Sequence, residues 1–327
     1  MTAPGPLGAS AGPLLDTYDA LLADLDGVVY LEDQPVAHAP DALQLVRSRG
    51  MRVCFVTNNA AHTPNDVVKR LESLGIAATT DEVVTSSMAA ADLLRLQFPP
   101  GTTVLVVGGQ GLWSAVEAVG LRPVSVASED VMPAAVVQGW GPDVGWANLA
   151  EATVALRHGA RWVATNVDRT LPSPRGPLPG SGSLIAAVQA ATGRTPDAIA
   201  GKPHPPLYEA ARERAHAERP LFVGDRLDTD IAGATGAGLP SLFVLSGVSR
   251  PIDLLGAPVE QRPTYLGPDL TALSAVHPRV DPDGTVHRIP GEPDDGLDAL
   301  RSLAARAWSG AVPPDQYHAA LTTLDLE

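Results

Sequence analysis

Short apolar runs alternate with segments of helical periodicity along most of this chain. Between the runs, apolar residues recur at the three- and four-residue spacing of an amphipathic helix, as at Val67, Val68, Leu71 and Leu74. This alternation predicts an α/β fold with a Rossmann-like parallel sheet flanked by helices. Strands are predicted at Leu21–Asp24, Val53–Thr57, Val104–Val107, Ala135–Gln138, Trp162–Thr165, Leu221–Val223 and Leu242–Leu245.

Helix boundaries are readable as well. Thr63 followed by Pro64 is a typical helix start, because threonine caps free N–H groups and proline fits the first turn, and Gly75 provides the end. Further helices are predicted over residues 86–98, 146–158 and 297–308.

The two ends of the chain differ from the middle in composition. Residues 1–18 are rich in Gly, Pro and Ala, and we expect them to form a flexible leader. Proline, aspartate and glycine cluster beyond about residue 270, so residues 271–327 are expected to form a C-terminal extension.

Composition narrows the possible functions. The net charge of -14 argues against a nucleic-acid partner, because an acidic surface repels phosphates. Cys54, the single cysteine, cannot form an internal disulfide and fits a reducing cytoplasm, where we expect the protein to reside. Apolar runs such as residues 103–107 are too short to cross a membrane.

Two aspartates, Asp24 and Asp26, stand one residue apart at the end of the first predicted strand, just before Gly27. Ligands of open α/β sheets bind beyond the carboxyl ends of the strands. Two carboxylates there are suited to holding a divalent cation and to dividing nucleophile and acid/base roles. On its own, the pair fits a solvated Asp-Gly turn equally well.

Two further segments offer groups for a phosphate. Thr57, Asn58 and Asn59 end the second predicted strand with a hydroxyl and two amides, although an N-capping turn explains them alone just as well. Lys202, between Gly201 and Pro203, follows a short apolar step and provides a positive point charge.

An acidic loop follows the strand predicted at residues 221–223. It contains Asp225, Asp228 and Asp230. Three acids in six residues repel one another unless a cation lies among them.

These four motifs, each at a strand end and in this order, resemble the haloacid dehalogenase superfamily of phosphatases over roughly residues 20–270. The resemblance implies a magnesium-dependent hydrolase of phosphomonoesters that forms an aspartyl-phosphate. Asp24 would be the nucleophile, and Asp26 would protonate the leaving alcohol and then activate water. Magnesium would be bound by Asp24, the main-chain carbonyl of Asp26, and Asp225, with Asp230 orienting them; phosphate would be bound by Thr57, Asn58, Asn59 and Lys202.

About 145 residues separate Thr57 from Lys202, which leaves room for an inserted domain. The chain resembles the NagD-like subclass, whose α/β insertion is the class IIA cap. We therefore expect a discontinuous phosphatase core at residues 19–89 and 196–270 and a cap at residues 90–195. Such caps pair in relatives, so a homodimer through the cap is a further expectation.

The substrate is expected to be a small phosphorylated metabolite. The chain is most similar to actinobacterial glycerol 3-phosphate phosphatases, with 2-phosphoglycolate and nucleotide monophosphates as alternatives. In the cap, Asn166 and Asp168 match its substrate-facing stretch 164–172, while Leu171 stands where pyridoxal phosphatases carry histidine. Arg175 and His204 are further candidates for substrate contact, although exposed loop positions explain both. A phosphotransferase or a non-catalytic sensor of the same fold are competing functions.

One other motif has a simpler explanation. Residues 107–111, Val-Gly-Gly-Gln-Gly, follow a strand and open a helix like a dinucleotide-binding loop. They lack the third glycine, so a plain strand-to-helix turn is favoured.

Overall fold

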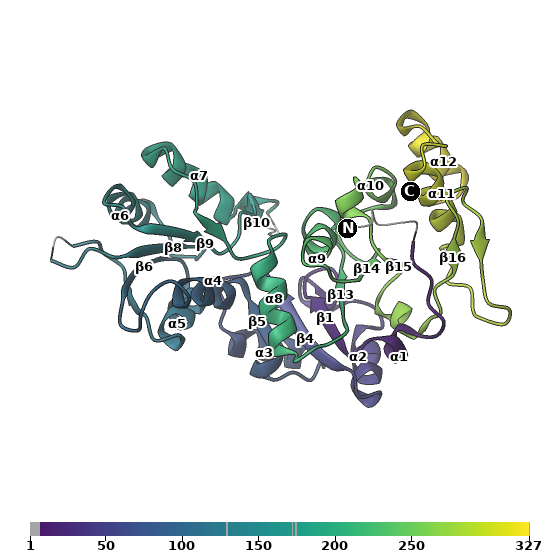
Figure 1. The fold of residues 1–327 in the computed structure, drawn as a ribbon, viewed down its shortest axis with the longest axis horizontal. Helices are drawn as coiled ribbons and strands as arrows, with labels where there is room; N and C mark the ends of the chain where they lie inside the picture. The colour runs from purple at the N-terminus through teal and green to yellow at the C-terminus, as the bar shows by residue number, and fades with distance from the viewer. Residues whose placement is uncertain (1–6, 129, 172, 174, 327) are drawn as a thin grey trace. The chain divides into compact units, whose positions relative to one another are not determined.

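The computed structural model describes residues 7–128, 130–171, 173 and 175–326. The chain folds into two compact units (Figure 1). Unit 1 comprises Met1–Phe55, Leu74–Ile76 and Ala211–Glu327, and unit 2 comprises Val56–Ser73 and Ala77–Ala210.

Unit 1 contains a buried parallel sheet. Strand β1 pairs in parallel with β13, β13 with β14, and β14 with β15. Every residue of β1 is buried, as expected for a strand covered on both faces. The sheet order is β15-β14-β13-β1-β4-β5. Unit 1 contains β1 (Ala20–Asp24), β13 (Pro220–Gly224), β14 (Ser241–Val244), β15 (Tyr265–Gly267) and the first four residues of β4 (Arg52–Thr57), whereas β5 (Val83–Thr85) belongs to unit 2.

Short helices and two small hairpins complete unit 1. In α2, Leu43 and Val46 are buried while the polar residues face outward. The helices are α1 (Leu14–Thr17), α2 (Ala39–Ser48), α9 (Ala232–Gly236), α10 (Pro251–Leu255), α11 (Asp298–Trp308) and α12 (Tyr317–Thr323). The hairpins join β2 (Tyr30–Leu31) to β3 (Gln34–Pro35) and β16 (Arg279–Val280) to β17 (Val286–His287).

Unit 2 has its own parallel sheet, in the order β12-β9-β8-β6-β7. Helices α6 and α7 lie along one face of it, and α4 and α5 along the other (Figure 1). The strands of this sheet are β6 (Thr103–Val107), β7 (Arg122–Val124), β8 (Ala135–Gln138), β9 (Arg161–Ala164) and β12 (Ala198–Ile199). The helices are α3 (Pro64–Ser73), α4 (Ser86–Arg95), α5 (Gln110–Ala118), α6 (Trp146–Arg157) and α7 (Ser181–Thr192). A small hairpin joins β10 (Thr170–Leu171) to β11 (Leu178–Pro179). Helix α8 (Pro205–Arg214) begins in unit 2 and ends in unit 1.

The α/β prediction is confirmed. All seven predicted strands are present, with ends that differ by at most one residue. No helix in the described part of the chain combines the length and the apolar character that crossing a membrane requires.

The N-terminal segment differs from the expected flexible leader where it is described. Leu14 and Leu15 of α1 are buried, and so is Leu7. The N–H of Gly8 donates to the carbonyl of Thr264 at 2.7 Å, and the N–H of Ser10 to that of His277 at 3.0 Å. Residues 7–18 are thus held in place by the few apolar side chains that stand between the Gly and Pro residues. Residues 1–6 lie outside the described residues.

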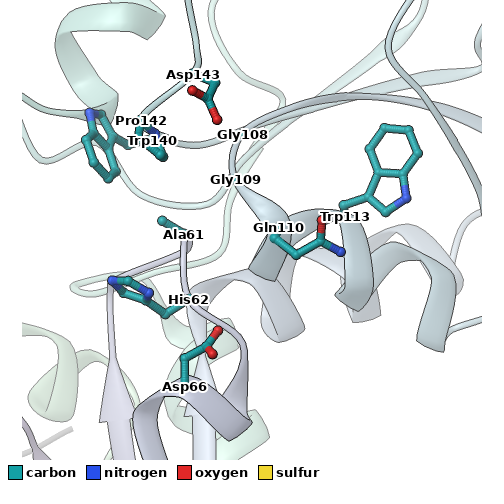
Figure 2. Close-up of a pocket in the computed structure, with 10 residues that line it drawn as sticks. All are labelled: Ala61, His62, Asp66, Gly108, Gly109, Gln110, Trp113, Trp140, Pro142 and Asp143. Carbon is teal, nitrogen blue, oxygen red and sulfur yellow. The ribbon is translucent and has the colours of Figure 1, made fainter. Parts of the chain in front are cut away.

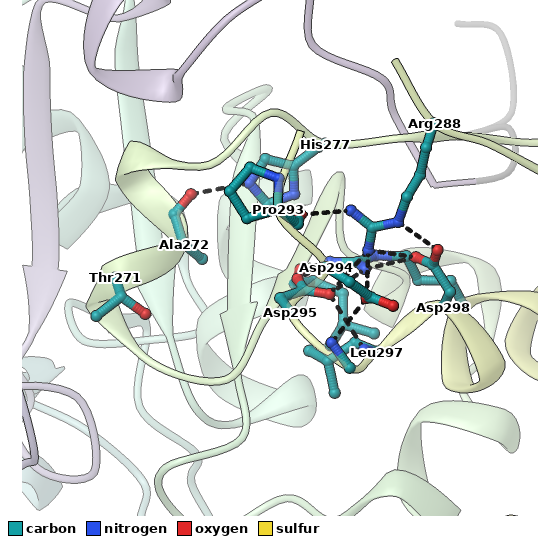
Figure 3. A network of polar contacts seen from close by, with 12 residues as sticks. Thr271, Ala272, His277, Arg288, Pro293, Asp294, Asp295, Leu297 and Asp298 are labelled. Atoms are coloured by element: carbon teal, nitrogen blue, oxygen red, sulfur yellow. Dashed lines mark hydrogen bonds and ion pairs between the residues drawn. The ribbon is translucent and has the colours of Figure 1, made fainter. Parts of the chain in front are cut away.

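The C-terminal extension shares its hydrophobic core with the sheet of unit 1. Leu300 and Leu303 of α11 pack in one cluster with Phe243 and Leu266 of β14 and β15. Arg301, only 2% exposed, donates to the carbonyl of Leu266 at 2.8 Å. Ion pairs with Asp295 and Asp298 balance its charge, and Arg288 joins the same network (Figure 3).

Candidate active site

In unit 1, the first predicted aspartate is held at the end of β1. Asp24 is buried, and its Oδ1 accepts a hydrogen bond from the N–H of Leu25 at 2.8 Å. The side chain of Asp26 is exposed. Gly27 follows with a φ of +83°, a conformation that side chains disfavour, so glycine permits the turn after the strand.

The acidic loop after β13 fixes two more carboxylates. Oδ2 of Asp225 accepts a hydrogen bond from the N–H of Val248 at 2.6 Å. Oδ2 of Asp230 accepts one from the N–H of Arg226 at 3.0 Å. Both side chains are buried, so their direction is set by the backbone around them.

Asp24, Asp225 and Asp230 form one cluster. An oxygen from each lies within 4.8 Å of the oxygens of the other two. A Cβ added to either Gly27 or Gly247 would lie 2.5 Å from Cγ of Asp225, so glycine alone allows this close approach. Buried carboxylates at such separations form the oxygen-rich donor set that Mg²⁺ prefers.

In unit 2, Thr57 and Asn59 organise the turn after β4. The hydroxyl of the buried Thr57 accepts a hydrogen bond from the N–H of Asn59 at 3.1 Å. The side-chain oxygen of Asn59 accepts one from the N–H of Ala61 at 2.9 Å. The turn therefore presents its polar groups in a fixed arrangement.

Asn58 bonds to two other loops. Its Oδ1 accepts a hydrogen bond from the N–H of Lys202 at 2.7 Å, and its Nδ2 donates to the carbonyl of Lys202 and to Oδ2 of Asp168, both at 3.1 Å. Its own carbonyl accepts from Asn166 Nδ2 and from the hydroxyl of Ser86, both at 2.7 Å. The amide of Asn58 is thus fully engaged within unit 2.

Lys202 is 4% exposed and lies in a tightly packed turn. The N–H of Gly201 donates to the carbonyl of Thr165 at 2.7 Å, and a Cβ on Gly201 would lie 2.5 Å from Oδ1 of Asn58. Nearby, the N–H of His204 donates to the carbonyl of Gly201 at 3.0 Å, and burial lowers the pKa of the His204 imidazole. Burial therefore favours the neutral form of this imidazole.

The predicted substrate-facing stretch is ordered by its own polar groups. The buried Asn166 accepts from the N–H of Asp168 at 3.2 Å through Oδ1, so both ends of its amide are bonded within unit 2. Asp168 is half-buried, whereas Arg175 is exposed. Pro172, the last residue of that stretch, lies outside the described residues.

Unit 2 contains a pocket of about 710 Å³. Its lining comes from the start of α5 and the residues just before it, from the loop after β8, and from Ala61, His62 and Asp66 (Figure 2). Its described lining includes Trp113 and Trp140 and contains none of the predicted site residues. A Cβ on Gly109 would lie 3.0 Å from Cα of Ala61, and the N–H of Gly111 donates to the Ala61 carbonyl at 2.9 Å. The glycines of residues 107–111 therefore serve close packing of two loops, as a plain turn requires.

The structure thus brings Asp24, Asp225 and Asp230 together in unit 1, and Asn58, Asp168 and Lys202 together in unit 2. Sequence reasoning missed residues 246–248. The hydroxyl of Ser246 donates to the carbonyl of Gly27 at 2.6 Å, and Val248 holds Asp225. The available signal was a Ser-Gly-Val run directly after an apolar strand, which glycine marks as a close approach.

Comparison with protein families gives two matches. A model described as haloacid dehalogenase-like hydrolase matches residues 21–122, which include Asp24 and Thr57. A second, described as HAD-hydrolase-like, matches residues 199–273, which include Lys202 and Asp225.

Individual relatives cover most of the chain. D-glycerol 3-phosphate phosphatase of Mycobacterium tuberculosis is 47% identical over 309 residues, covering 89% of this chain and 86% of that protein. An acid sugar phosphatase of Staphylococcus saprophyticus is 34% identical over 261 residues, covering 79% and 98%. The crystal structure of glycerol phosphate phosphatase from M. tuberculosis in complex with magnesium aligns with a TM-score of 0.86 at 43% identity, covering 97% of this chain and 100% of that one.

Proposed function

Since the chain belongs to the haloacid dehalogenase-like hydrolase family, we propose that it is a magnesium-dependent phosphomonoester hydrolase acting on glycerol 3-phosphate. The observation that carries the proposal is the buried cluster of Asp24, Asp225 and Asp230. A buried triad of this kind is strongly self-repelling without a cation, and a family relative is solved with magnesium.

The reaction has two steps. An oxygen of Asp24 forms a bond to phosphorus while the bond to the alcohol oxygen breaks, and the carboxyl of Asp26 gives its proton to the leaving alcohol. The carboxylate of Asp26 then takes a proton from water, whose oxygen bonds to phosphorus as the Asp24–phosphate bond breaks. The exposure of Asp26 suits a group that must reach both alcohol and water.

Magnesium would be bound by Asp24, by Asp225 and by the main-chain carbonyl of Asp26. Asp230 would orient these ligands, because it accepts a hydrogen bond from the N–H of Arg226, next to Asp225. Bound magnesium supplies positive charge that neutralises the phosphate and the nucleophile. We further propose that Thr57 and Asn59 hold the phosphoryl oxygens and that Lys202 neutralises charge on them.

The proposed substrate is a short polyol phosphate. The support is the similarity to the glycerol 3-phosphate phosphatase and the polar, non-aromatic stretch from Asn166 to Leu171. 2-Phosphoglycolate and nucleotide monophosphates are the alternatives. A phosphotransferase would need an alcohol, in place of water, to accept the phosphoryl group.

The broader organisation also remains a proposal. A discontinuous core at residues 19–89 and 196–270 would carry a cap at residues 90–195. A cytoplasmic location is supported by the single buried Cys54. A homodimer through the cap is proposed from the resemblance alone, and Trp146 of unit 2, which is 83% exposed, is a position at which it can be probed. Gel filtration of Trp146→Glu beside the parent protein tests that dimer.

The function is tested by a phosphate-release screen over small phosphomonoesters, with and without magnesium. Glycerol 3-phosphate should have the highest kcat/KM, and a chelator should abolish turnover reversibly. Addition of glycerol or a sugar as acceptor separates hydrolysis from phosphoryl transfer. Full activity in metal-free buffer would contradict the proposed function.

A further inference from the structure

We propose that Asn58 is a positioning residue that holds the Lys202 main chain and the Asp168 carboxylate in one arrangement, and that its amide does not bind phosphate. The proposal rests on the proposed function, because Lys202 and Asp168 matter through their roles in that reaction. It departs from the expectation that Thr57, Asn58 and Asn59 act alike.

The hydrogen bonds assign this role. A primary amide offers two N–H donors and one oxygen acceptor. In Asn58 both donors are used, on the carbonyl of Lys202 and on Oδ2 of Asp168, and the oxygen accepts the Lys202 N–H. The amide thus pairs with the N–H and the C=O of the same residue, which fixes the orientation of the chain there. A phosphate contact would have to break one of these bonds.

The packing around the amide leaves little freedom. Gly201 is the residue before the lysine, and a Cβ there would lie 2.5 Å from Oδ1 of Asn58. The carbonyl of Asn58 is held from the other side by Asn166 and Ser86. Hydrogen bonds therefore fix both the main chain and the side chain of Asn58. Lys202 is itself buried. Rotation of the amide toward another ligand would unpair several groups in this packed region.

A consequence follows for substrate choice. One amide joins the stretch expected to face the substrate, at Asp168, to the lysine expected to neutralise the phosphate. Loss of that amide should therefore reduce turnover of all substrates, whereas a change confined to the Asp168 charge should affect mainly substrates that contact it. Phosphate ligation by Asn58 would instead show as weakened binding of phosphate itself.

The test is an exchange of amide and carboxylate across the Asn58–Asp168 bond. Asn58→Asp places an oxygen against Oδ2 of Asp168 and the carbonyl of Lys202, and kcat/KM should fall about a hundredfold for both glycerol 3-phosphate and p-nitrophenyl phosphate. Asp168→Asn keeps an acceptor for Asn58 and should lose less than about tenfold on p-nitrophenyl phosphate. In the double variant the new amide at position 168 donates to the new carboxylate at position 58, so activity should recover at least about tenfold from the single Asn58→Asp value.

The matched control is Asn65→Asp, the same chemical change at an exposed position in the first turn of α3. It should leave both substrates unaffected. No recovery in the double variant would overturn the proposal, because a carboxylate at position 58 that faces phosphate repels it whatever stands at position 168.

A neutral variant covers the case in which Asn58→Asp does not fold. Asn58→Ser adds no charge, and its kcat should fall by more than its affinity for inorganic phosphate, measured as an inhibition constant. A loss confined to phosphate affinity would identify Asn58 as a ligand and overturn the proposal. Absence of turnover in the parent protein would contradict the proposed function instead, which separates the two failures.

Discussion

A Cβ on Gly27 would lie 2.5 Å from Cγ of Asp225, so the turn after β1 and the acidic loop after β13 meet where only glycine leaves room. Gly27 also has a φ of +83°. The carboxylate cluster of unit 1 therefore depends on the absence of a Cβ at Gly27 as well as on the acids themselves.

Gly27→Ala should displace Asp225 and raise the magnesium concentration needed for half-maximal activity by at least about tenfold. Magnesium titration of phosphate release measures this. Gly50→Ala is the matched control, because Gly50 has a similar φ of +77° and nothing within 4 Å of its added Cβ. Equal effects of the two changes would attribute the loss to backbone strain alone.

Asp24→Asn should abolish turnover, by at least about a thousandfold, because an amide oxygen cannot form the aspartyl-phosphate. Asp26→Asn should also stop turnover while leaving magnesium binding by calorimetry nearly unchanged, since its expected contact with the metal is main-chain. The control is Asp41→Asn, at an exposed position in the first turn of α2. A folded Asp24→Asn protein within tenfold of the parent would assign the nucleophile elsewhere.

The sequence predicts the central strands well because each signal is local. Residues 21–23 and 221–223 are apolar throughout, and Asp24 and Asp225 follow within two positions of their ends. The short edge strands β5 and β15 were missed, since three residues are too few to show a period.

Features that depend on distant partners could not be read in the same way. Leu14 is buried because it packs in unit 1, yet it lies in a stretch whose composition resembles a linker. Asn58 looks like a phosphate ligand beside Thr57, and only the fold places Lys202 and Asp168 against its amide. Composition likewise set residues 271–327 apart, although their leucines complete the core around Phe243.

His277 should make stability depend on pH. Its imidazole is buried against Tyr265, and its Nε2 lies 3.0 Å from the carbonyl of Ala272. Burial lowers its pKa below the ordinary value of 6.5, so the unfolded state binds the proton more readily. This contribution is complete above pH 6.5 and is lost as the pH falls through the folded pKa. When thermal denaturation is measured from pH 7.5 to pH 5, the Tm of His277→Gln should fall by less than the Tm of the parent protein. Equal decreases in Tm would exclude His277 as the cause of the pH dependence.

Arg301 should be important for stability although it lies far along the chain from the catalytic motifs. Its buried guanidinium pairs with Asp295 and Asp298, and its removal leaves Arg288 as the cation paired with those carboxylates and takes one donor from the carbonyl of Leu266. Arg301→Ala should therefore lower the free energy of unfolding by about 3 kcal/mol. Urea denaturation measures this, with Arg306→Ala, an exposed position of the same helix α11, as the control. A change below that of the control would show that the network contributes little.

The substrate ranking is the prediction that depends most on the side chains of unit 2. The stretch from Asn166 to Leu171 has no aromatic ring on which a pyridine or a nucleobase could stack. Hydroxyl groups of a three-carbon phosphate can pair with Asp168, and such pairs discriminate strongly when buried. Glycerol 3-phosphate should therefore exceed pyridoxal 5′-phosphate and nucleotide monophosphates in kcat/KM by at least about tenfold, or about 1.4 kcal/mol.

Asp168→Asn separates the two contributions of this residue to that ranking. It keeps the bond from Asn58, whose Nδ2 lies 3.1 Å from Oδ2 of Asp168, and removes only the charge offered to the substrate. The preference for glycerol 3-phosphate over p-nitrophenyl phosphate should shrink by about tenfold, because the reactive leaving group of the latter needs no hydroxyl contact. Asn166→Ala should instead lower kcat/KM for both substrates to a similar extent, since both ends of that amide form hydrogen bonds that order the loop. If Asp168→Asn, like Asn166→Ala, lowered kcat/KM equally for glycerol 3-phosphate and p-nitrophenyl phosphate, Asp168 would only shape the loop. A nucleotide with the highest kcat/KM would contradict the proposed substrate but not the proposed phosphatase reaction.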